Sequence, residues 1–359
     1  MSDPPVVIVG GGLGGLYAAR LLAAAGTKFL MLEARERLGG RILSVAADGF
    51  DLGPAWFWPD MQPTMARLVE ELKLTSFAQY SDGDVLIERS PQDPVQRFAG
   101  FGQMASSFRV AGGTGALVTA LAKQLPPNPI RLGATVMTAA LQDDGVSLAL
   151  DDGETVAASR VLFALPPRLL ERSVAFAPAI DPALRARWRQ TPTWMAPHAK
   201  FLAVYETPFW RDKGLSGTAQ SMTGPMVEIH DASAMPGTMT GRAALFGFLG
   251  VPAAARLAIG EKDLKAHCLA QLVRLFGPDA ATPAATFLKD WSADALTATV
   301  DDQQAGEHPL PMSQPWFDPA WENRAAMAGS ETAREHPGYL EGALLAAEAG
   351  VAGVLRMRM

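Results

Sequence analysis

Near its start the chain has four β-branched residues at positions 6–9, which lead directly into a glycine-rich turn and then into an alanine-rich segment over residues 17–26. An apolar run before such a turn is typical of a buried strand, and the segment that follows is long enough for a helix. A second apolar run covers residues 28–32 and ends at Glu33. Strand, turn, helix and strand in this order predict a βαβ unit, and therefore an α/β fold with a parallel sheet.

Further periodic patterns follow along the chain. Apolar residues at helical spacing predict helices over residues 64–74, 116–125 and 261–276. Short apolar or alternating runs bounded by turn residues predict strands over residues 130–136, 146–150, 156–164 and 243–250. Residues 81–107 are polar and show no strong period. From about residue 181 aromatic residues and prolines become more frequent, which indicates a second region with more extended structure.

Three glycines of the first turn, Gly10, Gly12 and Gly15, have the spacing G-x-G-x-x-G. Gly10 allows the turn, Gly12 lets the backbone approach a pyrophosphate, and Gly15 lets the helix pack closely on the strand. The N-terminus of the new helix offers free N–H groups to the phosphates. Glu33 lies 18 residues beyond Gly15, where an acid accepts hydrogen bonds from a ribose in dinucleotide-binding units. The pattern predicts a dinucleotide cofactor.

Composition narrows the class of protein. The 359 residues include 31 basic and 37 acidic ones, with a net charge of -6 and no long basic run, so no nucleic-acid partner is expected. The single cysteine excludes an intramolecular disulfide and fits a reducing compartment. The N-terminus lacks a basic region and no apolar run is long enough to span a bilayer, so we expect a cytoplasmic protein without signal peptide or membrane anchor. The five histidines lack metal-ligand spacing, so no metal is expected.

Residues 33–41 read E-A-R-E-R-L-G-G-R, in which two glycines allow a second close backbone approach and the arginines supply charge for phosphate. Together with the glycine fingerprint, this segment resembles the FAD-binding start of the flavin amine oxidase family, the monoamine oxidase-like proteins. Near the other end, A-G-S-E-T at residues 328–332 and G-Y-L-E-G-A at residues 338–343 resemble the closing signatures of the same family.

The resemblance implies an α/β protein with a Rossmann-like FAD-binding domain and a mixed-sheet substrate domain that has a reduced helical cover. The FAD-binding domain would be discontinuous and comprise residues 1–80, 108–180 and 305–359. The substrate domain would comprise residues 81–107 and 181–304. A later glycine turn fails the G-x-G-x-x-G spacing, so we expect one FAD and no NAD(P)H site.

The same resemblance implies which residues contact FAD. They belong to the two glycine turns, the acid after the second strand, a segment beside the flavin, a valine on the adenine side, a strand ending in tryptophan, and the closing signatures. The expected cofactor-binding residues are Gly10, Gly12, Leu13, Gly14, Gly15, Glu33, Ala34, Arg35, Gly40, Arg41, Gly53, Pro54, Ala55, Trp56, Val136, Trp291, Gly329, Ser330, Glu331, Gly338, Tyr339 and Leu340. For the neighbouring Trp58, contact with the flavin and core packing both stay open.

Two residues are expected to be catalytic. Lys200 begins K-x-x-x-x-Y-x-x-P-F-W, which resembles the strand that carries the active-site lysine of monoamine and polyamine oxidases, where the lysine holds a water against flavin N5. The alternative is a snorkelling lysine at the surface of a half-buried strand. Tyr339 would begin a helix over residues 339–352 and orient the amine nitrogen with its ring face. Hydride transfer to N5 would give an imine, and O2 would reoxidise the flavin with release of peroxide.

Beyond Trp291 the sequence departs from the family. Relatives with covalently attached flavin carry a cysteine there, followed by a tyrosine of the aromatic cage, whereas the only cysteine of this chain is Cys268. We therefore expect FAD to be bound non-covalently. Asp301 or Asp302 would take the place of one cage wall and put an acid near the entrance of an open pocket. Such a pocket favours a secondary, cyclic or multiply charged amine over small arylalkyl amines.

Other functions stay open at this point. An L-amino-acid oxidase would need an arginine clamp for the substrate carboxylate, and the candidates are Arg211, Arg242 and Arg256. A desaturase-like flavoenzyme acting on a non-amine substrate is the second alternative. A non-catalytic FAD-binding redox module is the third. The expected partners of the enzyme are a small-molecule amine and O2, and a homodimer is one expected assembly.

Overall fold

The computed structural model describes residues 4–45, 47–100, 107–126, 129–235, 237, 241–304, 307–312 and 315–356. Its first sheet has the strand order β20-β13-β1-β2-β9, and neighbouring strands run parallel. These strands are β1 (Val6–Val9), β2 (Phe29–Leu32), β9 (Ile130–Arg131), β13 (Arg160–Phe163) and β20 (Ala325–Met327). The central strand β1 is buried along its whole length, because a parallel sheet is covered on both faces.

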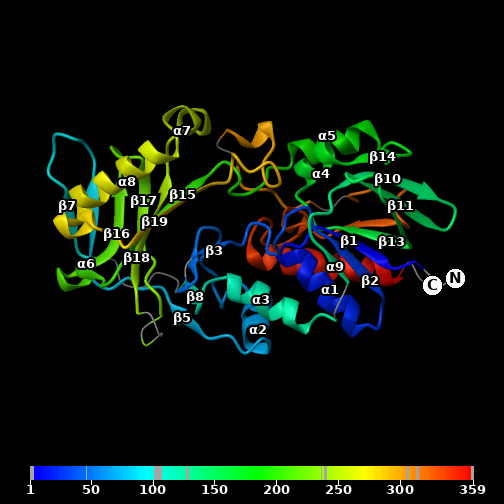
Figure 1. Ribbon diagram of the computed structural model, residues 1–359, viewed down its shortest axis with the longest axis horizontal. Helices are drawn as coiled ribbons and strands as arrows, with labels where there is room; N and C mark the ends of the chain where they lie inside the picture. Colours follow the sequence, from blue (N-terminus) through cyan, green and yellow to red (C-terminus); the bar gives the residue numbers. More distant parts are fainter. Residues whose placement is uncertain are drawn as a thin grey trace.

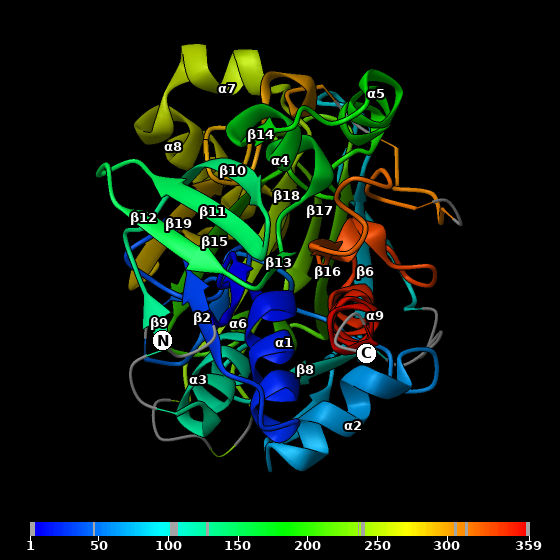
Figure 2. The same ribbon diagram turned by 90° about the vertical axis from the view of Figure 1, so that its right-hand side faces the viewer.

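One face of this sheet is covered by helices from both ends of the chain. The helices α1 (Leu13–Ala24) and α9 (Leu340–Arg356) lie side by side, with α2 (Pro63–Glu71) and α3 (Gly115–Gln124) beyond them (Figures 1 and 2). Val6 and Ile8 of β1 face these helices. Both ends of the chain therefore contribute to one hydrophobic core.

The opposite face, to which Val7 and Val9 point, packs on a second sheet with the order β12-β11-β10-β14. Its strands are β10 (Val136–Gln142), β11 (Gly145–Leu150), β12 (Thr155–Ala158) and β14 (Ala175–Ala177). The helices α4 (Pro167–Ser173) and α5 (Pro182–Gln190) lie beside this sheet (Figure 1). Asp181 caps α5, because its carboxylate accepts hydrogen bonds from two backbone N–H groups of the first turn.

A third, seven-stranded sheet lies at the end of the molecule away from the termini (Figure 1). Its order is β19-β15-β18-β17-β16-β6-β7. The strands are β6 (Asp84–Glu88), β7 (Gln96–Phe98), β15 (Ala199–Tyr205), β16 (Leu215–Ser221), β17 (Met226–Asp231), β18 (Ala243–Leu249) and β19 (Ala285–Asp290). The associated helices are α6 (Phe209–Asp212), α7 (Ala253–Ile259) and α8 (Glu261–Phe276). The side chains of α8 pack on one face of the sheet, and the other face is turned toward the first sheet.

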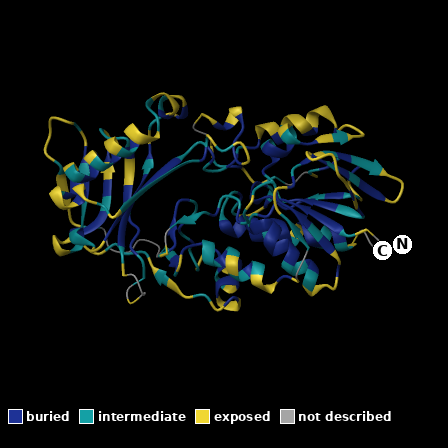
Figure 3. Ribbon diagram, viewed as in Figure 1, coloured by how far each residue is buried: buried dark blue, intermediate teal, exposed yellow. Residues whose placement is uncertain are grey.

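Short elements complete the described chain. Two strand pairs are formed by β3 (Ser44–Val45) with β4 (Phe50–Asp51) and by β5 (Ser76–Ala78) with β8 (Phe108–Val110), and three 3-10 turns are η1 (Pro278–Ala281), η2 (Val300–Asp302) and η3 (Ser330–Thr332). Figure 3 shows burial concentrated in the central strands and in α1 and α9, with exposed residues on the outer helices. Within the described residues, no helix combines the length and apolar character needed to span a membrane.

The predicted α/β fold with its βαβ start is confirmed, and the helix predicted over residues 261–276 coincides with α8. The strand predicted over residues 156–164 is instead two strands, β12 and β13, which belong to different sheets. The aperiodic segment 81–107 contributes β6 and β7 to the third sheet; its residues 101–106 lie outside the described residues. The division into two domains at the expected boundaries stays a prediction.

Candidate active site

A cavity of about 1090 Å³ lies between the first sheet and the seven-stranded sheet. The turns that follow β1 and β2 and the N-terminus of α9 line one end of it. Side chains of β15, β17 and β18 line the other end. The first of these is the cofactor end of the cavity, and the second is its substrate end. The carboxyl edge of a parallel sheet is the usual place for a ligand, because there the loops leave a crevice.

The glycines at the cofactor end have different surroundings. A Cβ on Gly15 would lie 1.9 Å from the carbonyl oxygen of Gly10, so Gly15 permits the close contact of α1 with β1. A Cβ on Gly12 would meet nothing nearer than 3.9 Å within the chain. Gly12 lines the cavity and Gly15 does not. The open side of Gly12 therefore faces the place where a cofactor would lie.

Glu33 ends β2 at the cofactor end and is 4% exposed. One carboxylate oxygen, Oε2, accepts a hydrogen bond from the Gly11 backbone N–H at 2.6 Å. The other, Oε1, accepts one from the Arg35 N–H at 2.8 Å. These bonds fix the carboxylate at the cavity wall, where its remaining lone pairs can accept hydrogen bonds from ribose hydroxyls.

An ion pair joins the beginning of the chain to its end beside the same cavity. The Arg41 guanidinium donates to Glu331 Oε1 at 2.5 Å and to Ser330 Oγ at 3.0 Å. The Glu331 side chain is fully buried and does not line the cavity, whereas Arg41 and Ser330 do. Glu331 therefore acts on the site through Arg41, whose position it fixes.

The N-terminus of α9 opens onto the cavity at Gly338, Tyr339 and Leu340. Its positive dipole end suits a negative charge on a ligand. The Tyr339 ring lies edge-on to Trp58, with 6.3 Å between ring centroids, and 5.0 Å from the ring of His308. Both Tyr339 and Trp58 line the cavity, so Trp58 is not packed in a closed core, and its contact with the flavin stays a prediction.

Lys200 lies at the junction of the two ends and is 2% exposed. Its Nζ donates to the Gly53 carbonyl at 3.2 Å and lies 3.9 Å from the centroid of the Phe246 ring. Burial lowers the pKa of Lys200 to about 7, against the opposing pull of the Asp51 carboxylate. The expectation of a half-buried strand is wrong, because every residue of β15 is buried. Lys200 is therefore no surface lysine.

Most of the other residues predicted for FAD binding also line this cavity. Those that do are Gly10, Leu13, Gly14, Arg35, Gly40, Gly53, Pro54, Ala55, Trp56, Trp291 and Gly329. Ala34 and Val136 do not line it. Val136 is buried in the core between the first two sheets, so its side chain lies away from the cavity and its expected contact with the adenine side is not supported.

Four further side chains at the substrate end belong to no motif: Trp194, His198, Glu228 and Phe248. The Trp194 and His198 ring centroids are 6.5 Å apart. The segment 226–231 alternates, and this alternation was the only available signal that Glu228 and His230 share a face. The place of Glu228 at the cavity depends on which strands become neighbours, and no local pattern encodes that.

The expected role of Asp301 and Asp302 is wrong. Asp302 is 2% exposed, caps η2 through Thr299 and forms an ion pair with Arg168. Neither aspartate lines the large cavity, although the adjacent Val300 does. The backbone turn of η2 needs an acceptor for its first N–H groups, and Asp302 satisfies that need. The acid of the substrate end is Glu228.

The three arginines considered as a carboxylate clamp are already engaged. Arg211 pairs with Asp231 at 2.8 Å, and Arg242 pairs with Glu206 at 3.5 Å. Arg256 lines the cavity, but its guanidinium is held in a two-bond contact with the Asp290 carboxylate. The geometry therefore offers no free guanidinium among these three for an amino-acid carboxylate.

Cys268 is buried against the third sheet on α8, away from the cavity, and burial raises the pKa of its thiol to about 12. It is the only cysteine of the chain, so no cysteine can link covalently to a flavin at this site. In the part of the chain that the structure describes, no group of three or more His, Cys, Asp or Glu side chains could hold a metal ion.

These residues fit FAD. The space above Gly12 admits a pyrophosphate, Glu33 suits a ribose, and the α9 N-terminus suits the electron-rich edge of a flavin ring. The cavity then continues past Lys200 to the substrate end, where aromatic side chains and one carboxylate remain for a second molecule.

Comparison with known proteins agrees with an FAD site in this cavity. A model of the flavin containing amine oxidoreductase family matches residues 93–355, and a model of the NAD(P)-binding Rossmann-like domain matches residues 8–72. The probable flavin-containing monoamine oxidase A of Dictyostelium discoideum is 24% identical over 94% of this chain and 94% of its own length. The putrescine oxidase of Kocuria rosea is 26% identical over 82% of this chain and 84% of its own. A solved structure of putrescine oxidase with putrescine, 22% identical, shares the fold with a TM-score of 0.79 over 98% of this chain and 99% of that one.

Proposed function

Because the chain belongs to the flavin-containing amine oxidoreductase family and is an FAD-dependent amine oxidase, we propose that its substrate is a diamine or polyamine. One amine would lie at the cofactor end, and a second, cationic amine would reach the carboxylate of Glu228. One observation carries this proposal: Lys200 pairs with Phe248 of β18, and Phe248 pairs with Glu228 of β17. The three side chains form one row across the sheet.

Residues that pair across antiparallel strands project from the same face of a sheet. Lys200, Phe248 and Glu228 therefore all point toward the cavity, which each of them lines. Neighbouring strands are about 4.8 Å apart, so the Lys200 and Glu228 backbones are roughly 10 Å apart across the row. A substrate with two amino groups separated by a short aliphatic chain, one neutral at the reacting position and one cationic at Glu228, suits this spacing.

The Glu228 carboxylate is ionised and has one oxygen available. Its Oε1 shares a hydrogen bond of 2.6 Å with His230 Nε2, and this bond lowers the pKa of Glu228. In the described part of the chain, Oε2 makes no hydrogen bond. The side chain is 49% exposed, so a cation can reach it from the cavity. The Trp56 and Phe248 rings on the way offer apolar and cation–π contacts to the chain of the amine.

FAD, when bound, supplies the acceptor for the hydride that leaves the amine. The chain itself positions the reactants: Tyr339 and Trp58 would flank the reacting nitrogen at the start of α9. The Gly53 carbonyl and the Phe246 ring hold Lys200 Nζ, where it can bind a water or carry a proton. The aromatic lining excludes bulk water and favours a neutral amine at the reacting position.

The test compares Glu228→Gln with the parent enzyme on 1,4-diaminobutane and on butylamine, with peroxide release as the readout. We expect kcat/KM for the diamine to fall about 5- to 30-fold, since one charge-assisted contact is worth about 1–2 kcal/mol at a half-exposed site. The value for butylamine should stay within twofold. Glu206→Gln is the matched control, because Glu206 is exposed directly after β15 and does not line the cavity.

An equal loss for both amines, or a parent enzyme that prefers butylamine, contradicts the proposed substrate class. Peroxide release from no amine at all contradicts O2 as the electron acceptor, which we propose on the basis of the family. A cytoplasmic location and a homodimer belong to the same proposal. Cell fractionation and sedimentation of the purified protein at several concentrations test these two points.

A further inference from the structure

A second, smaller cavity of about 430 Å³ lies outside the amine site, between α4, α5 and η2. It is lined by Arg168, Glu171, Arg172, Arg185, Arg189, Thr299, Val300 and Asp301. Half of these side chains are arginines, on a protein whose net charge is -6. Concentrated positive charge in a hollow of an acidic protein needs a counter-charge, either from the chain or from a ligand.

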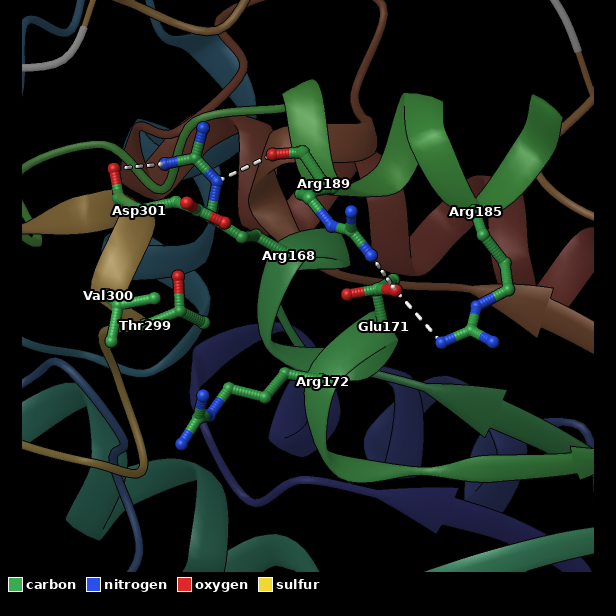
Figure 4. Close-up of a pocket in the computed structure, with 8 residues that line it drawn as sticks. All are labelled: Arg168, Glu171, Arg172, Arg185, Arg189, Thr299, Val300 and Asp301. Atoms are coloured by element: carbon green, nitrogen blue, oxygen red, sulfur yellow. Dashed lines mark hydrogen bonds and ion pairs between the residues drawn. The ribbon is translucent and has the colours of Figure 1, made fainter. Parts of the chain in front are cut away.

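The chain supplies only part of that counter-charge (Figure 4). The guanidinium of Arg168 is already bonded within the protein, because it donates to Asp302, to the Arg189 carbonyl and to the Asp301 carbonyl. Its side chain is 12% exposed. Glu171 Oε1 accepts from both Arg185 and Arg189, at 2.9 and 2.7 Å. One carboxylate therefore serves two guanidiniums, whose side chains stay 49% and 58% exposed.

Arg172 has no such partner. In the residues that the structure describes it forms no hydrogen bond or ion pair, and Figure 4 shows its guanidinium apart from the Glu171 cluster, near Thr299 and Val300. The Glu171 carboxylate thus binds the exposed guanidiniums of Arg185 and Arg189, and Asp301, beside Arg168, adds an electrostatic contact to Arg189. Among the described residues, Arg172 keeps no carboxylate partner. The unpaired N–H groups can donate hydrogen bonds to the oxygen atoms of a ligand.

We propose that this hollow, which we call the arginine pocket, binds a phosphate-bearing anion, either a free phosphate ester or a phospholipid headgroup. A phosphate monoester carries nearly two charges at neutral pH and three acceptor oxygens, and planar guanidiniums bind such oxygens in pairs. A single carboxylate would satisfy fewer of the free N–H groups.

The arginine pocket shares a wall with the amine site. Val300 lines both cavities. Asp302, which holds Arg168, also accepts a hydrogen bond from the backbone N–H of Thr193, next to the cavity residue Trp194. An anion in the pocket would neutralise positive charge close to the entrance of a cationic substrate. If the proposed diamine substrate is correct, phosphate therefore lowers the KM for it.

Binding is tested on the FAD-loaded protein, so that the cofactor site is closed to phosphate. Inorganic phosphate is titrated at pH 7.5 and constant ionic strength, with chloride as balancing ion, and followed by isothermal calorimetry. We expect one saturable site that binds phosphate at least fivefold more tightly than acetate. The double variant Arg172→Gln, Arg189→Gln should weaken phosphate binding at least tenfold. Arg89→Gln, which removes an exposed arginine at the end of β6, should leave it unchanged.

Two further measurements identify the source of the bound phosphate group and test its effect on the amine site. Co-sedimentation with phosphatidate-containing vesicles, lost in the double variant, identifies a headgroup, while binding of glycerol phosphate without vesicle binding identifies a free ester. Phosphate should lower the KM for 1,4-diaminobutane in the parent but not in the double variant. Absence of saturable binding, or equal affinity in the double variant, overturns the arginine pocket. An unchanged KM with intact binding overturns only the link to the amine site.

Discussion

The two ends of the large cavity are built in different ways. At the cofactor end, the walls are turns whose residues lie close together in the sequence, such as residues 10–15 and 338–340. At the substrate end, the wall is a row across three strands, and its members Lys200, Glu228 and Phe248 are neighbours only through strand pairing. The first kind of wall is tied to one ligand by backbone geometry, and the second can change its ligand by one side-chain substitution. Substitutions at the two ends should therefore have different consequences for folding, FAD binding and turnover.

The largest effect is expected at the glycine turn. Gly15→Ala puts a Cβ 1.9 Å from the Gly10 carbonyl oxygen, so we expect loss of both FAD and the native fold. Gly12→Ala meets no chain atom nearer than 3.9 Å, so the apoprotein should fold normally and fail to bind FAD. Circular dichroism measures the folding of each variant, and flavin absorbance measures its bound FAD. Gly353→Ala, in α9 with open space around it, is the control and should stabilise the protein by up to about 1 kcal/mol. Normal FAD binding by Gly12→Ala would contradict the prediction that the open side of Gly12 faces the pyrophosphate.

The substrate end should instead carry a stability cost that depends on pH. An unfolded lysine has a pKa of about 10.4, and burial lowers that of Lys200 to about 7 in the folded protein. Between these pH values the unfolded state binds more protons, so stability rises with pH. The cost is complete below pH 7 and vanishes above about pH 10.

Lys200→Met should therefore raise the free energy of unfolding by roughly 2–5 kcal/mol at pH 6 and by less at pH 9. Urea unfolding at both pH values measures the difference. Lys262→Met, at an exposed position of α8, should leave the pH slope unchanged. A methionine variant that is no more stable than the parent at pH 6 would show that Lys200 is not a desolvated base.

At the cofactor end, Glu33→Ala should weaken FAD binding by about 1–3 kcal/mol, the cost of unpaired ribose hydroxyls in a buried site. It also removes the acceptor for the Gly11 and Arg35 N–H groups. Glu36→Ala, at an exposed position three residues later, serves as the matched control. Fluorescence titration of the apoprotein with FAD gives both affinities, and equal values for the two variants would refute a direct role of Glu33.

A smaller effect is expected on the reaction with oxygen. A cation next to the reduced flavin favours electron transfer to O2, which gains negative charge. Since Lys200 loses its proton near pH 7, the reoxidation rate should fall as pH rises through about 7. Lys200→Met should be roughly tenfold slower at pH 6 and show no such step, while its flavin reduction changes less. Stopped-flow measurements of flavin reoxidation by O2 at pH 6 and 8.5 test this. An equal reoxidation rate in the parent and in Lys200→Met would contradict the prediction.

Substitution of the single cysteine, Cys268, is expected to leave flavin binding unchanged. Acid precipitation of the holoenzyme should release all flavin into the supernatant, because Cys268 lies on α8 away from the cavity. Cys268→Ser should retain the same flavin content. Flavin that stays in the pellet of the parent and not of this variant would contradict the burial of the thiol.

Sequence reasoning reached the cofactor end because a glycine turn, an acid after a strand and a helix start are each encoded within a few residues. It reached Lys200 through a local motif as well. The sequence analysis missed Glu228, because no pattern within β17 predicts that β18 lies between β17 and β15. It misassigned Asp302, since a capping acid and a substrate-binding acid look alike in sequence until the burial and the Arg168 contact are seen. Long-range pairing is the information that the single sequence lacked.

The contact between Arg41 and Glu331 has a consequence for the order of events during synthesis. Its partners are separated by 290 positions, and the strand β20 and helix α9, which complete the first sheet and its cover, are also far along the chain from β1 and α1. A ribosome-bound chain that lacks them has the glycine turn but not the opposite wall of the cofactor site. We therefore expect FAD capture to wait until residues 325–356 have been synthesised and have packed against the first part of the chain.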